Sequence, residues 1–266
     1  MKSMRLFILI YSLIFTGFLF LNVNAEASAV ITSHTGYVDS VGSYHVVGEV
    51  ENTGSTPLIF IRIAATFYDS ANQVVGAGFA YAFIQVLTPG AKSPFEVIFT
   101  EETQVPKIHH YALNVNFQEA GAVKPLHLAI TSHSNYTDAI GILHIVGEVE
   151  NQGEYTEFVK VIATGYGENG QVVAADFTYT DPPHLSHGQK APFNLMILSD
   201  RAPLVESFTV VAESDTYQSK PIPEFPTSLI VPALLTGVIL LLENRCVGDD
   251  VRRLHASREA YLAEKR

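Results

Sequence analysis

An internal repeat is the feature that most constrains the fold of this 266-residue chain. Residues 31–52 read ITSHTGYVDSVGSYHVVGEVEN and residues 130–151 read ITSHSNYTDAIGILHIVGEVEN, so 14 of 22 positions are identical at an offset of 99. The match continues at an offset of 98, where residues 63–81 face residues 161–179. A tandem duplication of a module of about 95 residues predicts two domains of one architecture.

Each copy has the pattern of short β-strands. Residues 46–51 alternate with period 2, which places valines on one face and Glu49 and Glu51 on the other, solvent-facing side. Turn residues follow at 52–54, at Asn72 and at 89–90, and an apolar run over 58–68 predicts a further strand. We therefore expect an all-β fold of two tandem immunoglobulin-like antiparallel β-sandwich domains, over residues 28–120 and 121–217.

These strand and turn residues resemble the FxLYD domain. The resemblance rests on HVVGEVEN at 45–52, ATFYD at 65–69, Val74-Val75, and Pro89-Gly90 ahead of Phe95. The second copy keeps VGEVEN at 146–151 but has Gly165 where the first copy has Phe67. The resemblance implies a small β-sandwich module of prokaryotic envelope proteins, with no enzymatic activity attributed to the family.

The N-terminal residues 1–27 have the features of a secretory signal peptide. Lys2 and Arg5 precede an uncharged apolar run over 6–23, and small residues at Ala25 and Ala27 offer cleavage sites. The alternative is an uncleaved anchor, because this apolar run is just long enough to cross a bilayer. Both interpretations predict that the following domains are exported.

The C-terminal residues predict a membrane anchor. A Pro-rich linker over 218–226 leads into a transmembrane helix over 227–242 and a cytoplasmic tail over 243–266 with basic residues. The linker ends in Pro223-Glu224-Phe225-Pro226, which is similar to the PEF-type sorting signal of archaeal surface proteins. That resemblance implies cleavage by an archaeosortase, although the tail is longer than in such signals. The alternative is a permanent single span. In both cases we expect a cell-membrane protein with extracytoplasmic domains.

Composition excludes several classes of function. A formal charge of −11 argues against a nucleic-acid partner, and one cysteine excludes a disulfide framework and thiolate metal sites. The sequence contains no Gly-x-Ser-x-Gly elbow, dinucleotide-binding glycine motif or phosphate-binding loop. We therefore predict no catalytic residues, no cofactor and no enzyme, with a hydrolase site between the two domains as a weaker alternative.

Histidines are the candidate metal ligands. His34 and His45 recur as His133 and His144 with the same spacing, and a hairpin turn over 38–41 would place His34 opposite His45 and, by the same rule, His133 opposite His144. Two imidazoles are half a site, and no third ligand is placed by spacing. A cross-strand surface pair is thus the default interpretation.

Two other motifs bear on binding and modification. Glu49 and Glu51, repeated as Glu148 and Glu150, fall short of the oxygen ligands that Ca²⁺ requires. Asn135-Tyr136-Thr137 makes Asn135 a candidate glycosylation site. The sequence thus favours a non-catalytic surface protein that binds another protein or a glycan. The alternative is an extracytoplasmic metal or small-solute binding protein that uses the paired histidines.

Overall fold

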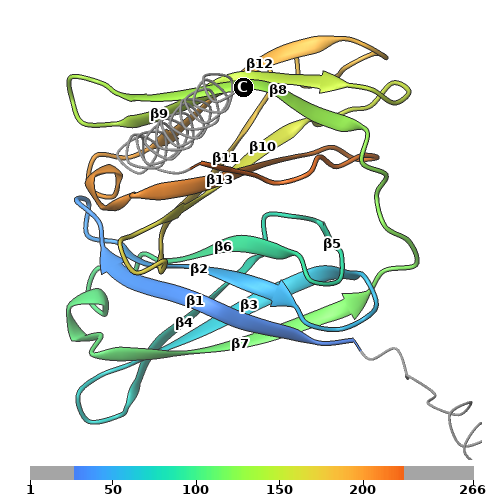
Figure 1. Ribbon diagram of the computed structural model, residues 1–266. Helices are drawn as coiled ribbons and strands as arrows, with labels where there is room; N and C mark the ends of the chain where they lie inside the picture. The colour runs from blue at the N-terminus through green and yellow to red at the C-terminus, as the bar shows by residue number, and fades with distance from the viewer. Residues whose placement is uncertain (1–26, 225–266) are drawn as a thin grey trace, which may run out of the picture. The chain divides into compact units, whose positions relative to one another are not determined.

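The computed structural model describes residues 27–224, and this part of the chain is all-β (Figure 1). The strands are β1 (Ala29–Val38), β2 (Tyr44–Asn52), β3 (Leu58–Tyr68), β4 (Val74–Tyr81), β5 (Val86–Leu87), β6 (Lys92–Phe99), β7 (His110–Glu119), β8 (Leu128–Thr137), β9 (Leu143–Asn151), β10 (Lys160–Tyr166), β11 (Val172–Tyr179), β12 (Lys190–Ile197), β13 (Ser207–Glu213) and β14 (Ile222–Glu224). Short 3₁₀ turns, η1 (Val105–Lys107) and η2 (Ala202–Leu204), precede β7 and β13. Within residues 27–224, no helix is long and apolar enough to cross a bilayer. The predicted signal peptide, transmembrane helix and tail lie outside the described residues.

The chain divides into two compact units. The first contains residues up to Ser33 and Val41–Lys124, and the second contains His34–Ser40 and the residues from Pro125 onward. Strand β1 is therefore shared between the units. The main division falls between Lys124 and Pro125, a few residues beyond the boundary expected from the repeat.

The first unit has two antiparallel sheets. One has the order β1-β2-β6, and in the other β3 pairs with β7 on one side and, on the other, with β5 near its start and with β4 beyond it (Figure 1). Strand β3 covers the apolar run predicted over 58–68, and its odd-numbered residues from Ile61 to Phe67 are buried while the even-numbered ones are half-exposed. This alternation is that of a strand with one face on the core. The outer face of the β4-β3-β7 sheet is consequently available for side chains with other roles.

The second unit repeats this architecture. Its sheets have the orders β12-β9-β8 and β11-β10-β13-β14. Its core gathers apolar side chains from both sheets, including Ile145, Phe193 and Leu195 from one and Val161 and Val210 from the other. Two facing antiparallel sheets with a shared apolar core form a β-sandwich-like unit. The strand β14 comes from residues predicted as a Pro-rich linker: Pro223 pairs with Thr209, so these residues up to Glu224 extend the second sheet.

The predicted turns are confirmed with their physical cause. Asn52 and its repeat Asn151 are fully buried, and each side-chain oxygen accepts a hydrogen bond from the backbone N–H two residues on, at Gly54 and Gly153. The turns after Pro89 and His187 have glycine at positive φ, at Gly90 and Gly188. Glycine adopts this conformation without steric cost.

The prediction that Glu49 faces solvent is wrong. Only 3% of Glu49 is exposed, because β2 is buried on both faces from Val46 to Val50. The Nζ atom of Lys92 lies 3.2 Å from Glu49 Oε2 and compensates the buried carboxylate. The repeated Glu148 is exposed, so the two copies differ here.

Candidate functional site: an exposed aromatic platform in each unit

The outer face of the β4-β3-β7 sheet has a cluster of aromatic, cationic and amide side chains, here called the first platform. It consists of Phe60, Arg62, Phe79, Tyr81, Asn114, Asn116 and Gln118. Strand pairing places Arg62 between Tyr81 and Asn116, and places Ala64 between Phe79 and Asn114. Because Ala64 is small, the residue directly opposite Phe79 on β3 leaves room beside the Phe79 ring.

The aromatic rings of the first platform are exposed. Phe79 and Tyr81 are 56% and 52% exposed, and their rings meet edge to face with centroids 6.2 Å apart. The Cζ atom of Arg62 lies 4.0 Å from the ring centroid of Phe79, within the range of a cation–π interaction. Side chains of this size are usually placed in the core or at an interface. Their exposure on one face therefore marks a candidate binding surface.

An unusual backbone conformation places the ring of Phe60 at the edge of this platform. It lies in a β-bulge of β3 opposite β7, between Ile59 and Arg62, and its φ is 50°. A positive φ costs a non-glycine residue about 1–2 kcal/mol, and bulges re-aim side chains near functional sites. The ring is 59% exposed, so core packing does not explain why a phenylalanine occupies this position.

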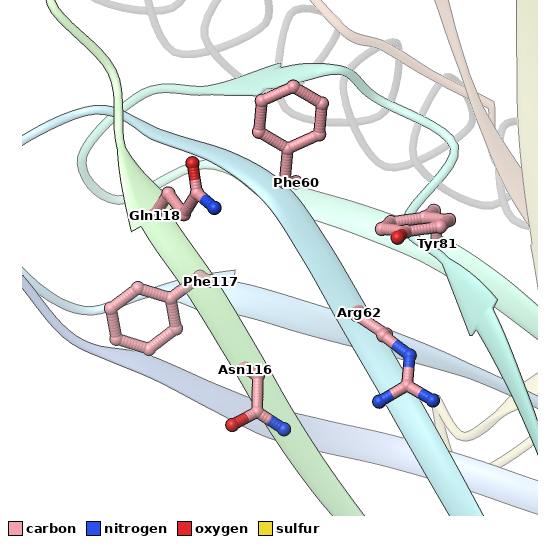
Figure 2. A pocket seen from close by; sticks show the side chains of 6 residues that line it. All are labelled: Phe60, Arg62, Tyr81, Asn116, Phe117 and Gln118. Atoms are coloured by element: carbon pink, nitrogen blue, oxygen red, sulfur yellow. The ribbon is translucent and has the colours of Figure 1, made fainter.

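An open pocket of about 320 Å³ overlaps the first platform. Its lining comprises Phe60, Arg62, Tyr81, Asn116, Phe117 and Gln118. Figure 2 shows these side chains, contributed by β3, by β7 and by the end of β4. The volume is at the lower end of the range for small-molecule sites, which combine aromatic walls with a few polar groups.

The amide side chains supply hydrogen-bonding groups on the platform. Asn116 Nδ2 donates to Asn114 Oδ1 at 2.8 Å, which fixes the orientation of both amides. This leaves the Asn114 Nδ2 donors and the Asn116 carbonyl oxygen facing outward without a partner among residues 27–224. A ligand with several hydroxyl groups could use such an arrangement, since each amide can both donate and accept.

The second unit has the equivalent cluster, here called the second platform. It consists of Phe158, Lys160, Phe177, Tyr179, Val211, Glu213 and Asp215, matched to the first platform by the repeat and by strand pairing. Phe177 and Tyr179 are again exposed and meet at 90° with centroids 6.1 Å apart. Lys160 Nζ lies 5.5 Å from the ring centroid of Phe177.

The backbone at the platform is repeated as well. The positive-φ residues of the described chain form four equivalent pairs, and three of these pairs consist of glycine or of Asn72 with Gly170. The fourth pair is Phe60 and Phe158, with φ of 50° and 54°. Residues 58–62 read LIFIR and residues 156–160 read TEFVK, so the phenylalanine is kept where its four neighbours differ. If recent duplication alone explained the match, the neighbouring residues would also be identical. The phenylalanine is therefore the feature that the two copies share at this position.

These platform residues were not among those predicted from the sequence. A usable signal was present: Phe79-x-Tyr81 recurs as Phe177-x-Tyr179, and residues two apart on a strand share a face. Which face is exposed follows only from the packing of β3 against the core.

The expected position of His133 opposite His144 is wrong. In the structure Tyr136 is opposite His144, and His133 is opposite Gly147. The hairpin turn is longer and later than expected, because Asp138 Oδ1 accepts hydrogen bonds from the backbone N–H groups of Ile140 and Ile142. These bonds lower the pKa of Asp138 below its usual value, and the bond from Ile142 has the largest effect.

Two of the four candidate histidines, His144 and His45, have other contacts. The His144 ring stacks on Tyr136 with centroids 4.7 Å apart and hydrogen-bonds to Asn194 and Asp138. His45 Nδ1 is 2.9 Å from Glu96 Oε1, and His34 lies on β1, the strand that pairs with β2. Among residues 27–224, no three histidine, cysteine or acidic side chains are grouped so that they could hold a metal ion.

The candidate glycosylation site and the first half of the sorting motif lie within the described residues. Asn135 is exposed on β8, the edge strand of its sheet, so a glycan at this position would meet no steric obstacle within the sheet. Of the sorting motif, Pro223 and Glu224 lie in β14, whereas Phe225 and Pro226 lie outside the described residues.

No protein-family model matches the chain, and no curated protein matches it. Similar solved structures include the exo-chitosanase CsxA of Amycolatopsis orientalis, with a TM-score of 0.28 and 10% identity over 72% of this chain and 26% of that one. Red sea bream transglutaminase has a TM-score of 0.27 and 11% identity over 77% of this chain and 32% of that one. A calcium-binding mutant of Bacteroides uniformis β-glucuronidase 2 has a TM-score of 0.28 and 11% identity over 73% of this chain and 28% of that one. This chain thus spans between a quarter and a third of the length of these proteins, and a likeness at this level carries no argument about activity.

Proposed function

We propose that this chain is a non-catalytic, exported binding protein that holds glycan chains on the aromatic platforms of its two units. The observation that carries the proposal is the exposed Phe-x-Tyr pair with a cation on the phenylalanine ring, present at the same positions in both units. The units themselves are proposed to be immunoglobulin-like sandwiches related to the FxLYD domain, in line with the seven strands of each.

The chemistry of the platform favours a glycan over a protein partner. A pyranose ring has an apolar C–H face, which packs on an aromatic ring, and equatorial hydroxyl groups, which need hydrogen-bond partners at the edge. The first platform has this combination, because Phe79 and Tyr81 provide ring faces and Asn114 and Asn116 provide amides. A surface that binds another protein would instead be expected to have a larger, continuous apolar centre.

Two further features suit a protein that acts at the cell surface. The apolar terminal runs at 6–23 and 225–242 are proposed as the export signal and the membrane anchor or sorting helix. Asn135 is proposed as a glycosylation site. The intact mass of the native mature protein would test these three proposals together, because signal cleavage, C-terminal processing and a glycan each change the mass by a different amount.

Binding to an array of immobilised polysaccharides tests the glycan proposal. The full-length protein is compared with two double variants, Phe79→Ala with Tyr81→Ala, and Phe177→Ala with Tyr179→Ala. Each double variant should weaken binding at least tenfold on its own platform, since the exposed rings contribute little to folding. Ile140→Ala removes an exposed apolar side chain from a hairpin turn outside both platforms and serves as the control. Unchanged binding in both double variants, or no binding by the wild type, would refute the proposal.

A further inference from the structure

We infer that the first platform selects glycans that carry carboxylate groups, with Arg62 as the residue that reads the charge. This inference rests on the proposed glycan-binding function and adds the chemical class of the ligand. It follows from a difference between the two platforms in the residues that surround the cation.

The cation of the second platform is neutralised within the protein. Glu213 is opposite Lys160 on the neighbouring strand, and its Oε2 atom lies 3.7 Å from Lys160 Nζ. Glu213 is 2% exposed, and Gln218 Nε2 donates a hydrogen bond of 2.9 Å to its other oxygen. Asp215 in turn accepts hydrogen bonds from the Thr156 hydroxyl and the Glu157 backbone N–H. The charges of this platform are therefore satisfied internally.

The first platform has amides where the second has carboxylates. Asn116 is opposite Arg62, in the position of Glu213, and Gln118 is in the position of Asp215. The side chain of Arg62 makes no ion pair or hydrogen bond within residues 27–224, and its guanidinium group lies over the face of the Phe79 ring. The guanidinium group is thus held on an aromatic ring while its N–H donors are available to an external acceptor.

Arginine is rare in the described part of this acidic chain. Residues 27–224 contain two arginines, Arg62 and Arg201, and Arg201 is buried with its Nε atom bonded to the Val173 carbonyl. The whole chain has 27 acidic and 16 basic residues. In an acidic protein, a cation without an acidic neighbour opposite it indicates that the anion comes from the ligand.

The geometry of the guanidinium group favours a carboxylate. Its planar fork matches the two oxygens of a carboxylate in a bidentate pair, and the adjacent Tyr81 ring can hold the sugar that carries this group. Asn116 and Gln118 line the same pocket and can bind the neighbouring hydroxyl groups. The expected ligand is consequently a chain of uronic acid residues or a similar carboxylated polysaccharide.

Polygalacturonate and its fully methyl-esterified form test this inference, because they share a backbone and differ in charge. We expect the full-length wild-type protein to bind the acid form at least tenfold more tightly in isothermal titration. Arg62→Gln should reduce that ratio to about one. Asn116→Glu, which recreates the arrangement of the second platform, should do the same. Lys220→Gln removes one positive charge from an exposed position outside both platforms and should leave the ratio unchanged.

The outcomes separate this inference from the proposed function. Equal binding of the two polymers by the wild type, or an unchanged ratio in Arg62→Gln, would overturn carboxylate selection while leaving glycan binding intact. A ratio that falls equally in Lys220→Gln would show a general charge effect and would also overturn it. If the wild-type protein bound no polysaccharide at all, the proposed function itself would be overturned. Circular dichroism of each variant establishes that the fold is retained.

Discussion

The side chain of Asn52 donates a hydrogen bond of 2.9 Å to the backbone carbonyl of Leu87, 35 residues further along the chain. It also donates to the Thr56 carbonyl, while its oxygen accepts from the Gly54 N–H. One buried amide therefore joins the end of β2 to the strand β5 and to the following turn. Asn151 makes the same set of contacts in the second unit, with Leu185, Glu154 and Gly153.

Replacement of Asn52 with alanine should destabilise the first unit by about 3 kcal/mol, because two carbonyl groups lose their donor in a buried site. Asn151→Ala should do the same to the second unit. Hydrogen exchange measured by mass spectrometry assigns each loss to its own unit. Gln152→Ala, at the exposed neighbouring position, should change stability by less than about 0.5 kcal/mol. Equal effects of Asn151→Ala and Gln152→Ala would contradict this account.

Phe60 should be more important for binding than for folding. Phe60→Gly and Phe60→Ala both remove an exposed ring, but only glycine adopts φ of 50° without steric cost. We expect the glycine variant to be more stable than the alanine variant by about 1 kcal/mol in urea unfolding. Both should bind polysaccharide more weakly than the wild type. Phe158→Gly and Phe158→Ala give the matched pair in the second unit, and an alanine variant as stable as the glycine variant would show that the backbone is not strained.

The sequence predicted the strands better than it predicted the surfaces. The turns at Asn52, Asn72 and Pro89-Gly90 and the strand over 58–68 follow from local residue preferences, and the structure confirms them. The register of β8 with β9 depends on how Asp138 closes its turn, a choice that strand periodicity leaves open. The platforms could not be located because an alternating strand pattern does not say which face another element covers. Glu49 illustrates the same limit, since its strand is buried on both faces.

Phe67 and Gly165 occupy equivalent positions but should tolerate exchange differently. The Phe67 ring is fully buried and contacts the rings of Phe99 and Tyr44, with centroids 4.9 and 5.4 Å away. At Gly165, a Cβ atom would lie 3.0 Å from a methyl group of Val205, which fills the space of the missing ring. The loss of the aromatic residue from the second copy is therefore compensated by a neighbouring segment.

Phe67→Gly should cost the first unit at least about 3–5 kcal/mol, because it leaves a cavity of ring size in the core. Gly165→Phe should not stabilise the second unit, since Val205 would have to move; adding Val205→Ala should recover part of the loss. Urea unfolding with unit-resolved hydrogen exchange measures both effects. A stabilised Gly165→Phe variant would show that the space beside Gly165 is open.

The stability of the first unit should fall at alkaline pH through Tyr111. Burial, with a smaller contribution from the charge of the neighbouring Tyr44, raises the pKa of Tyr111 to about 12. The unfolded chain loses this proton near pH 10, so above that pH the folded state binds more protons than the unfolded state. The contribution of Tyr111 is then fully present below pH 10 and is lost as the pH rises toward 12. Urea unfolding followed by circular dichroism between pH 8 and pH 11.5 should show this decline, and Tyr111→Phe should make it shallower while leaving stability near pH 8 similar to wild type. If both proteins lose stability with the same slope, groups other than Tyr111 determine the alkaline limit.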